Sequence, residues 1–566
     1  MIISRLISVI SLAAAANAGL LGLGTPTVVI PSPDATITGA ASAGVDAFKG
    51  IPFAVPPVGR NRLKPPQPIT QSMGSIHASE YGPACPQLYF SVEYDEGVIP
   101  TDALGRLMNT PIFQRVANND EDCLTLHIWR PSNVKPGAKL PVLFWIFGGG
   151  FEIGASSQYD GTQWVQTSIR MGQPIIFIAV SYRVGGFGFL PGKEIKEAGA
   201  GNLGLLDQRL GLQWVSDNIE SFGGDPDKVT IWGESAGAIS VFEQMMLYGG
   251  NNTYKNRTLF RAGIMNSGSL VPAQDIDSPK AQHIFNTVAT KAGCQGQKDV
   301  VECLRSLDYT TFLNACNSVR SFLSYGSVAL SYVPRPDGLS LPESPDILVK
   351  SGRFARVPMI IGDQEDEGTV FSFTESNITN HDELVGYVHD YYFNDGTWEV
   401  MNDLVNQYND TAENGSPFRT GHLNNIYPEF KRISALLGDV VFTLTRRVML
   451  NLVKSVDSGI KTWTYLATYD YGLPILGTFH GSDIIQVMNG VRDDYAARGF
   501  KQWYISFVNH LDPNKGKDAK YLEWPEWTPE SPHMVNVAAD SASLMTDDFR
   551  SGAYNVINDN VEQFRV

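Results

Sequence analysis

Four short runs of aliphatic and aromatic residues recur along the chain, each bounded by Gly, Pro or charged residues: Val142–Phe147, Ile175–Tyr182, Val229–Trp232 and Thr462–Tyr469. Continuous apolar runs of this length are typical of strands that are covered on both faces, as in a largely parallel sheet. Between the second and the third run, the segment Gly204–Ile219 places its large aliphatic side chains on one helical face. This alternation of strand, helix and strand predicts the α/β fold class.

The chain has 566 residues, of which 43% are apolar and 18% are charged. This composition is sufficient for a large core and excludes a disordered or fibrous protein. The length would allow several domains, but no linker rich in Pro, Gly or Ser divides the sequence, so we expect a single large domain with insertions. The formal net charge of −16 disfavours contact with phosphate backbones, and no nucleic-acid partner is expected.

Residues 1–18 have the features of a secretory signal peptide. Arg5 precedes an apolar stretch from Leu6 to Ala16, and Ala16-Asn17-Ala18 fits the rule of small residues at a cleavage site. We therefore expect a mature domain that spans residues 19–566 and a secreted, extracellular protein. Because no later segment reaches ~18 uninterrupted apolar residues, no transmembrane anchor is predicted.

Sequons and cysteines agree with an oxidising, extracellular compartment. The sequons predict N-glycosylation at five positions: Asn251, Asn256, Asn377, Asn409 and Asn414. Proximity in the sequence suggests the disulfides Cys85–Cys123 and Cys294–Cys303, with Cys316 left free. The five thiols allow many other pairings, which spacing alone does not exclude. No Cys/His cluster has the spacing of a zinc site, so no metal is expected.

The segment Gly233-Glu234-Ser235-Ala236-Gly237 carries the strongest chemical signal in the sequence. It directly follows the predicted strand Val229–Trp232 and precedes a helix predicted over Ala238–Leu247. A G-x-S-x-G pattern in this context is typical of a nucleophile elbow, in which a sharp turn presents the central serine. The flanking glycines allow strand and helix to approach closely, and the N-terminus of the helix favours developing negative charge. Ser235 is therefore the candidate nucleophile.

The whole segment Phe222–Gly237 closely resembles the active-site signature of the type-B carboxylesterase/lipase family. Glu121–Leu126 resembles the second signature of that family, although His127 stands where the family usually has Asp, Asn or Ser. Met545–Arg550 resembles the secreted fungal lipase and sterol esterase branch in particular. The resemblance implies an α/β-hydrolase fold, with a large and mostly parallel central sheet, helices on both faces, and insertions that include a lid.

A serine hydroxyl becomes a good nucleophile only beside a base that an acid orients, and in α/β-hydrolases the chain order is serine, acid, histidine. Glu365, Asp366 and Glu367 follow the apolar run Val357–Ile361, and the residues alone do not choose among these three acids. The stretch Asp366–Thr369 resembles the family element in which the glutamate is the triad acid. The resemblance therefore implies Glu367.

Seven histidines follow Ser235, and each by itself could be an ordinary structural residue. Leu476–Asp483 resembles the family pattern around the catalytic histidine, which implies His480 as the base. Gly148 to Gly150 directly follow a predicted strand, and the resemblance implies that the N–H groups of Gly149 and Gly150, with that of Ala236, form an oxyanion hole. These residues predict a serine hydrolase that cleaves carboxylic esters through an acyl-enzyme on Ser235 without a cofactor.

The loop Pro86–Asp122, between Cys85 and Cys123, covers the active-site mouth in this family. It contains a short amphipathic stretch with four large apolar residues at helical spacing: Leu104, Leu107, Met108 and Ile112. Such a stretch resembles a lipase lid that opens transiently at a lipid–water interface. The alternative interpretation is an ordinary surface helix that packs on the core.

The same loop bears on the substrate. Cholinesterases have a Trp there that binds quaternary ammonium groups, and this loop has none. Esters of long-chain fatty acids are therefore preferred, triacylglycerols first and steryl esters second. The alternatives are a short-chain carboxylesterase without interfacial activation, a protein that is mainly a sterol esterase, and a non-catalytic adhesion protein on the same fold. The oligomeric state is not predicted.

Overall fold

The computed structural model describes residues 25–89, 103, 105, 107, 110, 113, 114, 116–135, 137–488 and 490–566. The segment 1–18, which we predict to be a signal peptide, lies outside the described residues. So do Leu104, Met108 and Ile112 of the predicted lid helix, whereas Leu107 is described.

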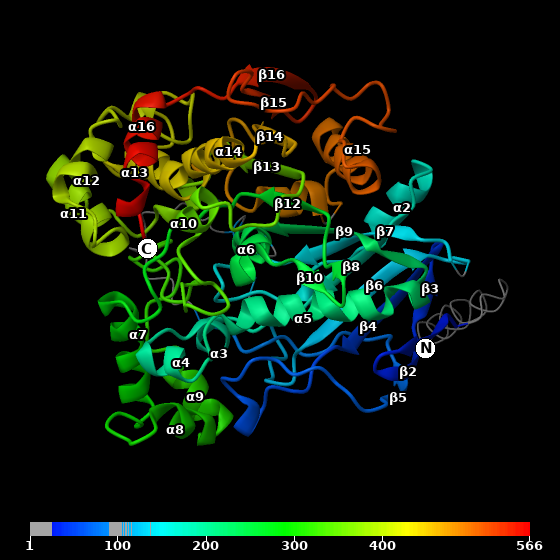
Figure 1. Ribbon diagram of the computed structural model, residues 1–566. Coiled ribbons are helices and arrows are strands. Elements are labelled where there is room, and N and C mark those ends of the chain that lie inside the picture. The colour runs from blue at the N-terminus through cyan, green and yellow to red at the C-terminus, as the bar shows by residue number, and fades with distance from the viewer. Residues whose placement is uncertain are drawn as a thin grey trace, which may run out of the picture.

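A large central sheet positions the functional residues (Figure 1). Its strands, in chain order, are β3 (Ala40–Ser42), β4 (Val45–Pro52), β6 (Thr125–Pro131), β7 (Leu140–Ile146), β8 (Ile176–Val180), β9 (Gly224–Glu234), β12 (Ala262–Asn266), β13 (Met359–Gln364), β14 (Thr462–Ala467), β15 (His533–Val537) and β16 (Ala542–Thr546). Their spatial order is β16-β15-β14-β13-β12-β9-β7-β8-β6-β4-β3. All neighbours from β8 to β15 pair in parallel, and strands pair antiparallel at the two edges.

Two smaller sheets accompany the central one. The first contains β1 (Thr27–Pro31), β2 (Asp34–Thr38) and β5 (Gly74–His77), and the second contains β10 (Thr253–Tyr254) and β11 (Arg257–Thr258). The predominantly parallel central sheet agrees with the α/β class that the continuous apolar runs predict. All four runs form strands of this sheet, namely β7, β8, β9 and β14, with ends that differ by up to a few residues.

The predicted helices are also present, with one informative difference. The helix predicted over Gly204–Ile219 is α5 (Leu203–Asn218). The helix predicted over Ala238–Leu247 belongs to α6 (Ala236–Gly250), which begins directly after Ser235 and leaves helical geometry at Leu247. Apolar periodicity does not detect its first residues, because Ala236 and Gly237 have little or no side chain to reveal a face.

Helices cover both faces of the central sheet, and the pairing of β9 with β12 shows which helix lies on which face. Gly263 of β12 faces α6, since a Cβ there would lie 2.4 Å from Met245, and Gly263 pairs with Ile231. Trp232 follows Ile231 and therefore points to the opposite face. There its ring contacts Trp164 of α2 (Thr162–Arg170) and Tyr504 of α15 (Tyr495–His510).

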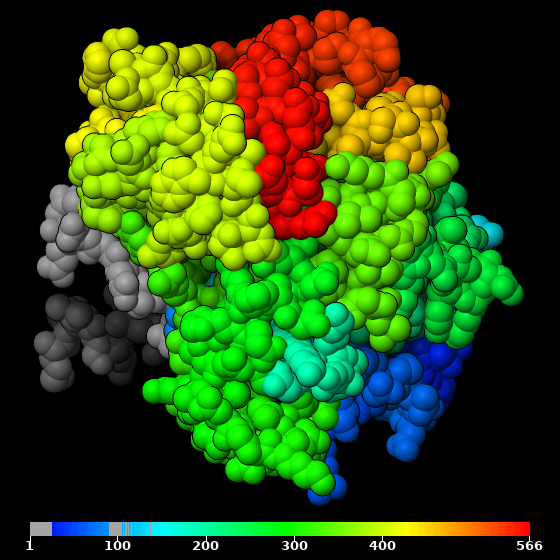
Figure 2. All heavy atoms as spheres, turned by 60° about the vertical axis from the view of Figure 1, so that its left-hand side comes forward, coloured from blue at the N-terminus to red at the C-terminus, as the bar shows by residue number. Residues whose placement is uncertain are grey.

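The remaining helices surround this core. They are α3 (Gly185–Phe189), α4 (Lys193–Glu197), α7 (Pro279–Lys291), α8 (Val300–Ser306), α9 (Tyr309–Cys316), α10 (Pro345–Lys350), α11 (His381–Tyr387), α12 (Trp398–Val405), α13 (Phe430–Gly438), α14 (Leu444–Val456) and α16 (Ser551–Asp559). The C-terminal helix α16 packs against α12 and α14. Figure 2 shows this segment in red beside the yellow-green region of α11 and α12.

Covalent and surface features are placed as the sequence suggests. Disulfides join Cys85 to Cys123 and Cys294 to Cys303, and Cys316 is a buried free thiol. The asparagines of all five sequons are exposed. Among the described residues, none of the helices combines the length and apolar character that crossing a membrane requires.

Candidate active site

Ser235 occupies the turn between β9 and α6 with strained backbone geometry. Its φ and ψ are 56° and −125°, a combination that non-glycine residues rarely adopt and that functional sites often retain. The N–H of Ser235 donates to the carbonyl of Asn266 at 2.9 Å, and its own carbonyl accepts from the N–H of Ile239 at 2.9 Å. The neighbouring strand and the first helical turn thus hold the serine in this conformation.

The two glycines of the G-x-S-x-G pattern are required by close backbone packing. A Cβ on Gly233 would lie 2.2 Å from the carbonyl oxygen of Gly237. A Cβ on Gly237 would lie 2.1 Å from the carbonyl oxygen of Ile146, at the end of β7. Any larger residue would therefore separate α6 from the sheet and move Ser235.

The structure brings Ser235, His480 and Glu367 together although they are far apart in the sequence. His480 Nε2 lies 2.8 Å from Ser235 Oγ, and His480 Nδ1 lies 2.6 Å from Glu367 Oε2. His480 and Glu367 are each 1% exposed, and Ser235 is 7% exposed. The hydroxyl, the imidazole and the carboxyl therefore form a continuous hydrogen-bonded chain that is almost completely shielded from solvent.

The two neighbouring acids that the sequence leaves open have other partners. Glu365 forms an ion pair with Arg419, whose Nε lies 3.0 Å from Glu365 Oε1. Asp366 accepts hydrogen bonds from Ser416 Oγ and from the N–H of Thr478. Of the three consecutive acids, Glu367 is thus the one whose carboxyl contacts His480.

Burial determines the protonation of this chain. It lowers the pKa of His480 to about 4, against the opposing effect of Asp483 and Asp363, so the imidazole is neutral at neutral pH and able to accept a proton. Burial also raises the pKa of Glu367, whereas hydrogen bonds from Ser267 and from the N–H of Gln364 oppose that shift. A positive charge on the imidazole would form 2.6 Å from Glu367 and favour its ionised form.

Asn266 connects Ser235 to neighbouring buried residues through hydrogen bonds, and the sequence did not indicate this role. Its side chain donates to Asp483 Oδ2 at 2.8 Å, and its Oδ1 accepts from Tyr504 Oη at 2.9 Å. Its carbonyl also holds the N–H of Ser235. A single Asn has no sequence motif of its own, and the available signal was its place at the end of β12, the neighbour of β9.

Glu234 lies beside the hydrogen-bonded chain. Its Oε1 is 3.5 Å from His480 Nε2, and neither carboxyl oxygen forms a hydrogen bond with another described residue. Burial and the charges of Asp483 and Glu367 raise the pKa of Glu234 well above its ordinary value. Ser235 Oγ, at 2.8 Å, is closer to His480 Nε2 than this carboxyl oxygen is.

Gly149 and Gly150 lie in the loop that follows β7 and line the same pocket as Ser235. Their φ angles are 113° and 63°, and a Cβ on Gly149 would lie 2.3 Å from the carbonyl oxygen of Ile153. No described residue accepts a hydrogen bond from their N–H groups. Ala236 begins α6, where N–H groups have no partner within the helix. The three N–H groups are therefore available to a ligand at Ser235.

His127 stands where the family usually has Asp, Asn or Ser, and its side chain forms hydrogen bonds at that position. It lies in β6, where its Nδ1 accepts from the N–H of Gly50 at 2.8 Å and its Nε2 lies 2.9 Å from Ser156 Oγ. Burial lowers its pKa to about 3, so this imidazole remains neutral. It has no contact with the Ser235 site and acts as a structural residue.

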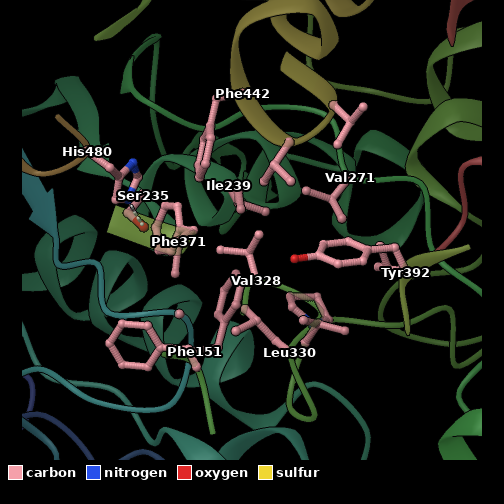
Figure 3. Close-up of a pocket in the computed structure, with 18 of the residues that line it drawn as sticks. Phe151, Ser235, Ile239, Val271, Val328, Leu330, Phe371, Tyr392, Phe442 and His480 are labelled. Atoms are coloured by element: carbon pink, nitrogen blue, oxygen red, sulfur yellow. Dashed lines mark hydrogen bonds between the residues drawn. The ribbon is translucent and has the colours of Figure 1, made fainter. Parts of the chain in front are cut away.

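Ser235 opens into a long, mostly apolar pocket (Figure 3). The space between its lining residues amounts to about 960 Å³, including solvent at the mouth. In Figure 3, Ser235 and His480 lie at one end, and Val271 and Tyr392 lie toward the other. Phe113, from the loop that the Cys85–Cys123 bridge closes, also lines this pocket. The pocket thus offers an apolar chain a path that begins at the candidate nucleophile.

Comparisons with known proteins identify one family. A model described as the carboxylesterase family matches residues 26–556. The chain is 56% identical to secreted lipase 1 of Botryotinia fuckeliana, over 96% of this chain and 94% of that protein. It is 52% identical to secreted triacylglycerol lipase LIP1 of Gibberella zeae, over 94% and 90%. Among solved structures, EstA of Aspergillus niger matches with a TM-score of 0.78 and 25% identity, covering 95% of this chain and 99% of that one.

Proposed function

The chain belongs to the carboxylesterase family, and we propose that it is a triacylglycerol lipase whose catalytic triad is Ser235, His480 and Glu367. It has the α/β-hydrolase fold and is a carboxylic ester hydrolase. The protein is secreted, like the relatives that are named secreted lipases. The observation that carries the triad is the continuous hydrogen-bonded chain from Ser235 Oγ through His480 to Glu367, at 2.8 and 2.6 Å.

The first half of the reaction acylates the serine. Ser235 Oγ attacks the ester carbonyl carbon while its proton moves to His480 Nε2, and Glu367 stabilises the imidazolium through Nδ1–H. The N–H groups of Gly149, Gly150 and Ala236 stabilise the oxyanion that develops on the carbonyl oxygen. The bond to the alcohol oxygen then breaks, and that oxygen takes the proton from His480. The acyl group remains on Ser235.

The second half uses water in place of the alcohol. A water molecule attacks the acyl carbonyl and gives its proton to His480, and a second oxyanion forms at the same N–H groups. When it collapses, the bond to Ser235 Oγ breaks and the serine recovers its proton from His480. The fatty acid leaves, and the triad has returned to its starting protonation. No cofactor enters either half of this mechanism.

The pocket supports a long acyl chain as the substrate. Its lining includes Phe371, Phe442 and Leu330, which provide apolar contact along its length, and burial of each methylene contributes about 0.8 kcal/mol. Among the relatives, the protein of Gibberella zeae is named a triacylglycerol lipase. Phe113 at the pocket supports the view that the loop Pro86–Asp122 acts as a lid over this site.

A panel of nitrophenyl and glycerol esters tests this proposal. We expect hydrolysis to increase with acyl length from acetate to palmitate, and to rise further when the long-chain ester forms an emulsion. Ser235→Ala should lower turnover by roughly 10⁴–10⁶-fold and provides the blank for every substrate. Highest activity on dissolved acetate would identify a short-chain carboxylesterase, and preference for cholesteryl oleate over triolein would identify a sterol esterase.

Two further proposals concern processing. We propose that residues 1–18 are removed as a signal peptide, which leaves a domain of residues 19–566. We also propose that glycans attach to the exposed asparagines of the sequons: Asn251, Asn256, Asn377, Asn409 and Asn414. N-terminal sequencing and glycopeptide mass spectrometry of the secreted protein test both statements.

A further inference from the structure

One acidic residue stands among the mostly apolar residues that line the substrate pocket. Glu243 lines this pocket together with Ser235 and Ile239. Its side chain is 2% exposed, and Oε2 is buried without a hydrogen bond to any described residue. An unpaired polar atom in an apolar environment costs folding free energy. A ligand that supplies the missing partner would offset this cost.

Glu243 has a defined position relative to the nucleophile. Ser235, Ile239 and Glu243 follow one another at intervals of four residues, so they lie along one face of α6. At 1.5 Å per residue, Glu243 lies about 12 Å beyond Ser235 along the helix axis. A chain that is esterified at Ser235 and extends along this face therefore passes the carboxyl well before its end if it is long.

The carboxyl of Glu243 is electrostatically isolated. Burial alone raises its pKa to about 8, and it forms no ion pair within the described part of the chain. At neutral pH it is therefore protonated and can donate one hydrogen bond as well as accept others. This state is compatible with an uncharged acyl chain and well suited to a hydroxyl or other oxygen function.

Tyr392 is the other polar group on the wall away from the triad, and its surroundings differ. Its hydroxyl points into the pocket in Figure 3 and, like Glu243 Oε2, has no hydrogen bond to a described residue, although the hydroxyls of Ser327 and Tyr387 lie near it. Polar groups thus lie near Tyr392, whereas no polar or charged neighbour contributes to the pKa shift of Glu243. Of these two unpaired groups, Glu243 is the one whose pKa burial alone shifts, so it lacks the polar neighbours that Tyr392 has.

We propose that Glu243 is a specificity-determining residue that binds an oxygen atom carried partway along the acyl chain, so that the enzyme prefers esters of oxygenated long-chain fatty acids, such as hydroxy acids, over unsubstituted ones. This inference rests on the proposed function, since it assumes that the acyl chain occupies the pocket. It adds a polar contact to a site otherwise selective for length and hydrophobicity. A purely structural role predicts no such preference.

A positional series of substrates tests the proposal. Nitrophenyl stearate is compared with stearate esters that carry a single hydroxyl at successive carbons, and kcat/KM is measured for each. We expect one position, or two adjacent ones, to be preferred over stearate by about 3–10-fold, the value of one hydrogen bond. Glu243→Leu should remove this preference and raise kcat/KM for stearate itself, and Glu243→Gln should keep most of the preference.

A matched control separates this contact from the general effect of altering a buried acid. Glu375 is buried like Glu243 but does not line the pocket. Its carboxylate accepts hydrogen bonds from the hydroxyls of Thr374 and Tyr387. Glu375→Gln should leave the ratio of hydroxystearate to stearate unchanged. If Glu243→Leu does not fold, as judged by circular dichroism, Glu243→Met takes its place.

The outcomes distinguish this inference from the proposed function. Hydrolysis of stearate by the wild-type enzyme with no preference at any hydroxyl position would overturn the role of Glu243 and leave the lipase proposal intact. Loss of stearate and hydroxystearate hydrolysis in equal proportion in Glu243→Leu would overturn it as well. Wild-type enzyme that cleaves neither ester would refute the proposed function and, with it, this inference.

Discussion

The imidazole of His480 contacts two aromatic rings, with centroids 5.0 Å from Phe371 and 4.5 Å from Phe442. These rings exclude water from the base. An ordinary histidine has a pKa near 6.5, which would place the loss of activity between about pH 5 and 7. Burial lowers the pKa of His480 to about 4, so the structure moves this expectation to lower pH.

The pH dependence follows from the sign of that shift. In the proposed mechanism His480 must be neutral to accept the proton of Ser235, so we expect activity to be retained above its pKa and to fall as pH decreases through it. We expect the acid limb of kcat/KM for a soluble nitrophenyl ester to have its midpoint near pH 4. The measurement needs a parallel check that the fold persists at each pH. A midpoint near 6.5 would show that the base is solvated.

The loop that bears the predicted lid is an element defined by its covalent closure. The Cys85–Cys123 bridge joins residues 38 positions apart, whereas the Cys294–Cys303 bridge spans 9. At the two ends of the longer loop, Gln87 binds the backbone of Gly154 and Asp120 binds that of Ala84. The disulfide and these contacts therefore fix the base of the loop next to the turn that bears Gly149 and Gly150, the proposed oxyanion-hole residues.

The two disulfides should differ in their contribution to stability. In the chain-entropy model, removal of Cys85–Cys123 by paired Ser substitutions lowers the free energy of unfolding by about 4 kcal/mol, and removal of Cys294–Cys303 by about 2.5 kcal/mol. Urea unfolding of the two double variants provides the comparison, and each variant serves as the control for the other. An equal or reversed order would mean that native contacts, not loop length, dominate.

At the scale of the whole molecule, the sequence predicts most of the framework. The continuous apolar runs identify β7, β8, β9 and β14 because these strands are buried on both faces. Polar residues therefore do not alternate with the apolar ones, and the run stands out in the sequence. The turn at Ser235 can also be predicted from the sequence, because close backbone packing requires glycine at positions 233 and 237. Local signals of this kind survive in a single sequence.

Contacts between residues that are far apart in the sequence are harder to predict. The residues alone did not separate Glu365, Asp366 and Glu367, because the choice depends on Arg419 and Ser416, which lie about fifty residues further along the chain. Family resemblance indicated Glu367, and the contact with His480 is consistent with it. Asn266 and Glu243 carried no motif at all. Packing places Asn266 next to Ser235 and Glu243 in the lining of the pocket that opens from Ser235.

The most direct test of the account asks which atom of the enzyme becomes covalently modified. The protein is treated with a long-chain alkyl phosphonate ester, whose phosphorus is attacked as an ester carbonyl would be, and the adduct is located by peptide mass spectrometry. If Ser235 is the nucleophile, one adduct per chain forms on Ser235, activity is lost in proportion, and no adduct forms in Ser235→Ala. Inactivation with the label on another residue, or full labelling of Ser235 with ester hydrolysis undiminished, would contradict it.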